Sequence, residues 1–115
     1  FYPLHVKPRS RTVALSEYGG IAWPMPGHEA PGRTYGYGTA KSRADLTARF
    51  KKLQLGTVLP QLAKGLSALV YTQLTDVEDE VNGLFTYDRA ETKPDANAVR
   101  SVNAALAAEF AKVTR

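Results

Sequence analysis

The sequence contains no cysteine, one methionine and one tryptophan among its 115 residues, and it has no long apolar run. The lack of cysteine excludes disulfide bonds and thiolate metal sites, and it is compatible with a reducing compartment such as the cytoplasm without requiring one. No run of about eighteen apolar residues is present, so the sequence predicts no transmembrane helix and no membrane partner. At this length we expect residues 1–115 to form at most one small domain.

Positive charge exceeds negative charge, and the formal net charge is +4 at pH 7. An excess of positive charge can attract nucleic acid or another acidic partner. Here the basic residues form two loose clusters and are otherwise scattered, and neither cluster alternates with aromatic residues as in proteins that bind single strands. The clusters are Lys7, Arg9 and Arg11, and Arg49, Lys51 and Lys52. We therefore expect a solvated basic surface and no nucleic-acid partner.

The apolar pattern predicts an α/β fold with two buried strands. Residues 12–16 and 66–74 are short, apolar and rich in β-branched or aromatic types, which is typical of buried strands. Glu17 follows the first strand directly. A helix is expected between the strands and another after the second one. This β-α-β order predicts two parallel strands joined by a right-handed crossover.

Two helices are expected from capping residues and apolar spacing. Ser42-x-x-Asp45 resembles a capping box and opens a helix over about 43–55. Gly56 and Pro60 predict a break or a kink near its end, followed by a short second piece reaching 64. Asp95 is expected to cap the last helix, whose apolar side chains recur every three or four residues on one face. These residues are Val99, Val102, Leu106, Phe110 and Val113.

Two loops lie outside these elements. Residues 21–40 are dense in glycine, proline and aromatic residues, so no regular element is expected there, and the aromatic content favours a functional loop over a disordered one. The second loop is acidic. Its alternating oxygen-bearing residues have the spacing of a calcium loop, but Gly83 stands at the eighth position and Tyr87 at the twelfth, so we expect no metal site. A salt-bridged loop that includes Asp88 and Arg89 is the expected alternative.

Two stretches of the sequence resemble one known family. Val13–Trp23 reads V-A-L-S-E-Y-G-G-I-A-W, and Tyr71–Arg89 reads Y-T-Q-L-T-D-V-E-D-E-V-N-G-L-F-T-Y-D-R. They resemble, in the same order, the seventh and eighth barrel strands of glycoside hydrolase family 2, which includes β-galactosidases, β-glucuronidases and β-mannosidases. The resemblance implies that residues 1–115 are the C-terminal fragment of the catalytic domain, comprising the last two β/α units of a (β/α)₈ TIM barrel.

The resemblance implies that Glu17, within Ser-Glu-Tyr-Gly-Gly, is the catalytic nucleophile of a retaining β-glycosidase. Such enzymes use two carboxylates about 5–5.5 Å apart, one as nucleophile and one as acid/base. In the family the acid/base is a Glu that follows an Asn at the fourth strand, upstream of the part resembled here. We therefore expect the fragment alone to be inactive. Composition by itself would describe Glu17 as a surface residue at a strand end.

The resemblance also implies a substrate pocket around the end of the second strand. Tyr71, Gln73 and Asp76 lie where the family's pocket is walled. Some members have tryptophan in this region, so the sugar stays unidentified. Tyr71 is equally compatible with a core position, since alternate residues of a strand face opposite sides.

The aromatic residues of the first loop have two interpretations. Trp23, Tyr35 and Tyr37 either stack on a sugar or pin the loop to the barrel mouth.

The implied partner is a carbohydrate substrate, and no cofactor is implied. Open strand edges and an uncovered apolar face predict that the fragment either self-associates or packs with the missing part of the barrel. One alternative is a non-catalytic carbohydrate-binding or interaction module that keeps the aromatic loop. Another is an unrelated small α/β domain.

Overall fold

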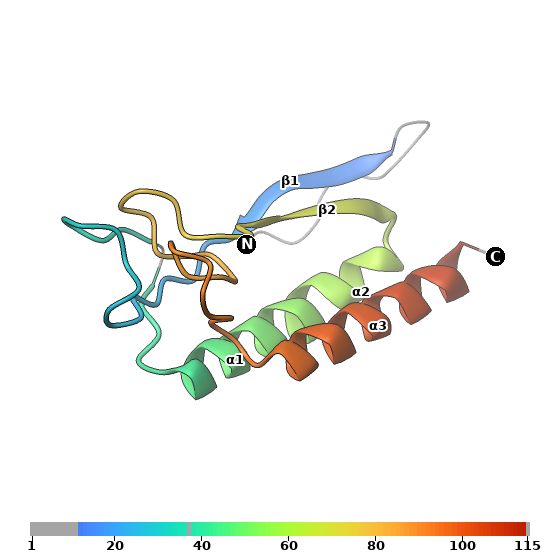
Figure 1. Ribbon diagram of the computed structural model, residues 1–115. Helices are drawn as coiled ribbons and strands as arrows, with labels where there is room; N and C mark the ends of the chain where they lie inside the picture. The colour runs from blue at the N-terminus through green and yellow to red at the C-terminus, as the bar shows by residue number, and fades with distance from the viewer. Residues whose placement is uncertain (1–11, 37, 115) are drawn as a thin grey trace.

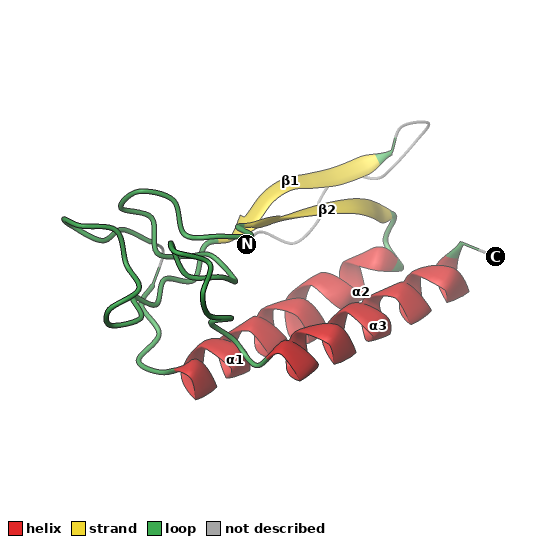
Figure 2. Ribbon diagram, in the orientation of Figure 1, coloured by secondary structure: helices red, strands yellow, loops and turns green. Residues whose placement is uncertain are grey.

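The computed structural model describes residues 12–36 and 38–114, which form a two-layer α/β unit. A two-stranded sheet, β1 (Val13–Gly19) and β2 (Leu66–Thr72), lies over a layer of helices. The helical layer consists of α1 (Arg43–Lys51), η1 (Lys52–Val58), α2 (Leu59–Leu62) and α3 (Ala96–Val113). In Figure 2 all the helices lie on the same side of the sheet.

The strands pair in parallel, as the β-α-β order predicted. β1 extends further than expected, because it continues through Glu17 to Gly19 and does not end at residue 16. Tyr18 and Gly19 pair with Tyr71 and Thr72 of β2, and this pairing keeps the backbone extended. The predicted end of the first strand is therefore wrong, and Glu17 lies inside the strand. β2 ends at Thr72, two residues before the predicted end.

The helix between the strands runs without interruption from residue 43 to residue 62, so of the predicted break or kink at Gly56 and Pro60 the break is wrong. Its middle part, η1, is a wide π-helical segment, and at its end the Leu59 N–H donates to the Gln54 carbonyl five residues earlier. In an α-helix a proline ring clashes with the carbonyl four residues before it. The wider turns just before Pro60 accommodate the ring without ending the helix.

Both predicted helix caps are confirmed. Ser42 Oγ accepts from the Asp45 N–H at 3.1 Å, and Asp95 Oδ1 accepts from the Ala98 N–H at 2.8 Å. The return bond of the first cap differs from the usual capping box. The Asp45 carboxylate accepts from the N–H of Lys41, one residue before the cap.

The core lies between one face of the sheet and the helices. Val58, Leu62 and Leu66 form its buried centre, and further apolar side chains from both strands and α3 pack against it. These are Val13, Leu15, Tyr18, Leu69 and Leu106. On the other face Ala14 and Ala68 are exposed, and Val70 is 56% exposed. Most parallel sheets are covered on both faces. Among the described residues, helices cover one face of this sheet only (Figure 2), and we call the other its open face.

The predicted apolar face of α3 is only partly buried. Val102 is buried and Leu106 packs on the core, whereas Phe110 and Val113 near the end of the helix are exposed. A hollow of about 210 Å³ lies between β2 and α3, and we call it the apolar hollow. It is lined by Leu62, Ser67, Ala68, Leu69, Leu106, Ala107 and Phe110. Within the described residues, none of the helices is long and apolar enough to cross a bilayer.

Candidate functional site

Two loops meet at the carboxyl ends of the strands (Figure 1). The first loop comprises residues 20–42 and the second loop residues 73–95. Backbone hydrogen bonds join them: the Trp23 N–H donates to the Val81 carbonyl at 2.8 Å, and the Val81 N–H donates to the Tyr35 carbonyl at 2.9 Å. The Tyr35 N–H also donates to the Asp79 carbonyl. Since parallel strands end at the same edge, the two loops form one joined unit there, which we call the loop layer.

Over residues 20–36 and 38–42, the described part of the first loop, there is no regular element, as predicted, yet the backbone is held in place. The Ala22 N–H donates to the Gly38 carbonyl at 3.1 Å, and the Ala40 N–H donates to the Ala22 carbonyl at 2.7 Å. Gly36 sits against this pairing, because a Cβ atom on it would lie 2.3 Å from the Ala22 Cβ. Gly36 therefore permits the close approach to Ala22, whereas Gly27 and Gly32 have open space where a Cβ atom would stand.

Glu17 lies on the open face of the sheet. Its neighbours Leu15 and Tyr18 pack on the core, while Ser16 and Glu17 are both exposed. The strand register explains this pattern. Leu15 pairs with Leu69 and Tyr18 pairs with Tyr71, so three residues along β1 correspond to two residues along β2. Such a shift, typical of a β-bulge, redirects side chains and is common beside active sites. Glu17 is exposed, and Tyr18 and Gly19 separate it from the start of the loop layer at residue 20.

Tyr71 lies in the core. Its ring meets Tyr18 and Phe50 edge-on, with ring centres 5.5 Å and 5.4 Å apart, and burial raises its pKa to about 12. Tyr18 is also part of this aromatic group, and its hydroxyl donates to Gln54 Oε1 at 3.0 Å. The sequence left a core position and a pocket position open for Tyr71. The geometry supports the core position for Tyr71.

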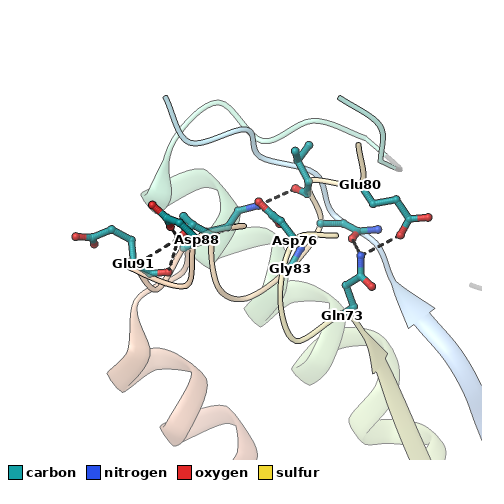
Figure 3. A network of polar contacts seen from close by, with 10 residues as sticks. Gln73, Asp76, Glu80, Gly83, Asp88 and Glu91 are labelled. Carbon is teal, nitrogen blue, oxygen red and sulfur yellow. Dashed lines mark hydrogen bonds and ion pairs between the residues drawn. The ribbon is translucent and has the colours of Figure 1, made fainter. Parts of the chain in front are cut away.

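Gln73 organises the second loop (Figure 3). Its amide Nε2 donates to Glu80 Oε2 at 2.9 Å and to Asn82 Oδ1 at 2.7 Å. Its backbone carbonyl accepts from the Leu84 N–H at 3.0 Å, and the Thr72–Gln73 peptide bond is cis. Both donors of the Gln73 amide group point at loop acceptors. The contribution of Gln73 to a site is therefore to position the loop.

Asp76 is the centre of a buried ion pair. Lys93 Nζ donates to both carboxylate oxygens at 2.7 Å and 2.9 Å, and to the Val81 carbonyl at 2.7 Å, while the Gly83 N–H donates to Asp76 Oδ1 at 2.8 Å. Asp76 is 3% exposed and Lys93 is fully buried. Burial raises the pKa of Asp76 and lowers that of Lys93, and the ion pair acts in the opposite direction. The carboxylate is thus bound within the loop and buried from solvent.

Sequence reasoning missed Lys93. A single lysine before the Pro94-Asp95 cap carries no signal of burial, because lysine is almost always exposed unless it is paired. Only the fold brings it to Asp76, seventeen residues earlier in the chain.

A second polar group links the two loops through His28 and Asp88. His28 Nδ1 lies 2.8 Å from Asp88 Oδ2, and Asp88 Oδ1 accepts from Thr86 Oγ1 at 2.6 Å and from the Ala90 N–H at 3.0 Å. The Thr86 hydroxyl, the Ala90 N–H and His28 lower the pKa of Asp88 to about 2. The expectation that Asp88 helps to fix an ion-paired loop agrees with these contacts. Arg89 contributes through its backbone, since its N–H donates to the Thr86 carbonyl.

The aromatic candidates differ in their surroundings. Trp23 is half-buried and tied to the second loop through its backbone, whereas the Tyr35 side chain is 52% exposed. Tyr37 lies outside the described residues. Tyr87, which the sequence analysis did not select as a site residue, is 44% exposed in the second loop. The two loops therefore present Tyr35 and Tyr87 to solvent while their backbones are joined.

Among residues 12–36 and 38–114, no three His, Asp or Glu side chains are close enough to one another to hold a metal ion. Asp76, the first residue of the calcium-like spacing, forms a salt bridge with Lys93. Comparison with known proteins gives no match: no family model fits this chain, and no curated protein matches it. The resemblance to glycoside hydrolase family 2 therefore stays a prediction.

The buried ion pair leads to a first prediction. Lys93→Met should leave the Asp76 charge unpaired in the interior and lower the free energy of unfolding by about 3–5 kcal/mol. Arg43→Met is the matched control: it removes a cation from the exposed pair with Glu91 and should cost about 0–1 kcal/mol. The double variant Asp76→Asn/Lys93→Met should recover part of the loss. Equal small losses for Lys93→Met and Arg43→Met in urea unfolding would contradict this assignment.

The depressed pKa of Asp88 predicts a dependence of stability on pH. The pKa of an Asp carboxyl in an unfolded chain is about 3.9. The pKa of Asp88 in the fold is about 2. The carboxylate therefore stabilises the fold fully above about pH 5, and this contribution is lost as the pH falls toward 2. Asp88→Asn should be less stable at pH 7 and should converge with the wild type near pH 2. Urea unfolding at several pH values measures both curves, and parallel curves would exclude the role of Asp88.

Proposed function

We propose that this chain forms the last two β/α units of the catalytic barrel of a retaining β-glycosidase, with Glu17 as the nucleophile. The observation that carries the proposal is the position of Glu17, an exposed carboxylate on the open face of a parallel strand, beside the loop layer. In (β/α)₈ barrels the chemistry lies at the carboxyl ends of the strands and in the loops that follow them. The register shift at Ser16–Glu17 supports the same assignment.

The chemistry of a retaining glycosidase requires one carboxylate as nucleophile, and we assign this role to Glu17. The Glu17 carboxylate would attack the anomeric carbon while an acid on the other side protonates the departing oxygen. Water would then cleave the glycosyl–enzyme ester, helped by the same acid/base group. Asp76 and Asp88 are bound to Lys93 and to Thr86 and His28, so neither carboxylate is available as the acid/base group. The resemblance implies that the acid/base glutamate lies at the fourth strand, upstream of the part resembled here, so this chain alone should be inactive.

The sheet supports the barrel assignment. Among the described strands, β1 and β2 pair only with each other, so each has an unpaired outer edge. Their open face carries Val70, 56% exposed, and Leu74 follows β2 with 66% exposure. In a barrel, neighbouring strands would pair with both edges and the open face would line the interior. Packing against the rest of a barrel, or self-association of the isolated chain, follows from the same surfaces.

The self-association proposal predicts the behaviour of the isolated 115-residue chain. Once circular dichroism shows that the chain is folded, light scattering should detect oligomers, and Val70→Lys/Leu74→Lys should reduce them by placing charges on the open face. Leu55→Lys, which charges a 36% exposed position in the helical layer, should leave association unchanged. A monodisperse wild-type monomer would contradict the proposal.

A second candidate function is a non-catalytic carbohydrate-binding module. It is favoured by one observation, the exposure of Tyr35 and Tyr87 in the loop layer, because aromatic faces stack on sugar rings. The two functions differ at Glu17, which the enzyme requires and the module does not.

Covalent labelling tests the enzyme proposal directly. The complete protein that contains this chain is incubated with 2-deoxy-2-fluoro glycosides of several sugars and digested for peptide mass spectrometry. The expected adduct is on Glu17, because these reagents trap the glycosyl–enzyme ester of a retaining nucleophile. Glu17→Gln should give no adduct. Folded protein that no reagent labels, but that still binds sugars, would favour the module.

A further inference from the structure

The loop layer contains a second hollow, separate from the residues of the nucleophile site. It has a volume of about 440 Å³ and draws its lining from both loops. We call it the loop hollow, and it is lined by Ala30, Pro31, Arg33, Glu78, Asp79 and Tyr87. Sites for small molecules commonly measure about 300–1,000 Å³. The size is therefore sufficient for a ligand of one or two sugar rings.

The charged side chains of the loop hollow are available for a ligand. The sequence has 11 acidic residues, all among the described ones, and most of them accept a hydrogen bond or pair with a cation there. The exceptions within residues 12–36 and 38–114 are Glu17, Glu78 and Asp79. Two of the three line the loop hollow, and the Arg33 guanidinium there has no partner among the described residues either.

Glu78 is held in a backbone conformation that disfavours it. Its φ is +51°, in the left-handed region that glycine adopts most easily. The turn that imposes this angle is closed by two hydrogen bonds between Val77 and Glu80, at 3.1 Å and 2.9 Å. A glutamate kept at such a position reduces stability, and residues of this kind cluster at ligand sites. The glutamate side chain is thus better explained by a ligand than by the fold.

The mixture of groups indicates the chemistry of the ligand. Sugar hydroxyls donate to carboxylates and accept from a guanidinium, while the C–H face of a sugar ring stacks on an aromatic ring. Glu78 and Asp79 supply acceptors, Arg33 supplies donors, and Tyr87 supplies a ring that is 44% exposed. Two carboxylates against one guanidinium leave one net negative charge, which disfavours an anionic ligand.

We propose that the loop hollow is a second sugar-binding position, which binds a neutral hexose unit of an oligosaccharide through Glu78, Asp79, Arg33 and Tyr87. This inference rests on the proposed function, since both the glycosidase and the carbohydrate-binding module would bind a sugar. It adds to that function a position built without Glu17 and a preference for neutral over acidic sugars.

Calorimetric titration of the complete protein, with Glu17→Gln to prevent turnover, tests the proposal. The probes are lactose and cellobiose as neutral sugars and methyl β-D-glucuronide as the acidic one. Arg33→Ala and Glu78→Gly should each raise the Kd for the preferred neutral probe about tenfold or more, because each removes a charged hydrogen-bonding group. Arg43→Ala, which removes an exposed arginine of α1, is the matched control and should leave the Kd unchanged.

Thermal unfolding of Glu78→Gly separates binding from a structural role. Glycine relieves the positive φ, so the variant should be as stable as the wild type or more stable while it binds more weakly. Loss of stability, an unchanged Kd in both hollow variants, or tighter binding of the glucuronide would overturn the proposal. Labelling of Glu17 with unaffected hollow variants would leave the catalytic function standing without the second position. Weaker neutral-sugar binding in the variants, without any label, would leave the position standing without catalysis.

Discussion

The loop layer depends on the buried ion pair between Asp76 and Lys93. Burying two charges costs several kcal/mol per ion, and the pair is tolerated only when its other hydrogen-bonding capacity is satisfied. Here the Gly83 N–H and the Val81 carbonyl complete the set. Gly83 also has no room for a side chain, since a Cβ atom would lie 2.2 Å from the Asp76 nitrogen. Because Val81 also bonds to the first loop, one interaction fixes the path of both loops.

Six of the eleven acidic residues of the chain fall into two contrasting groups. Asp76, Asp88 and Glu80 are bound to a lysine, to a histidine and a hydroxyl, and to a glutamine, and they hold the loops in place. Glu17 and the pair Glu78 and Asp79 have no such partner among the described residues. Because a satisfied carboxylate would have to lose its bonds before it could bind a ligand, the two proposals rest on the second group alone.

The helices cover one face of the sheet (Figure 2), and the proposed nucleophile lies on the opposite face. Val58, Leu62 and Leu66 bury one face, and the opposite face carries Glu17 and Val70. Within residues 12–36 and 38–114 the parallel pair has an open face and two unpaired edges, and it buries less apolar surface than a sheet with both faces covered. The positions that a complete barrel would use for its interior are thus the ones this chain leaves exposed.

The sequence by itself determined what depends on neighbours along the chain. The caps at Ser42 and Asp95, the apolar strands and their parallel order follow from short-range patterns, and the structure agrees with each of them. Residues distant in sequence decided the rest. The Tyr71 ring packs against Phe50 in the apolar surface of the helical layer. The Asp76 carboxylate forms a salt bridge with Lys93. The helix continues through Pro60 because the turns before it are π-helical and therefore wider. Local propensity contains no information on which distant side chain will occupy a face, so only the tertiary structure could assign these roles.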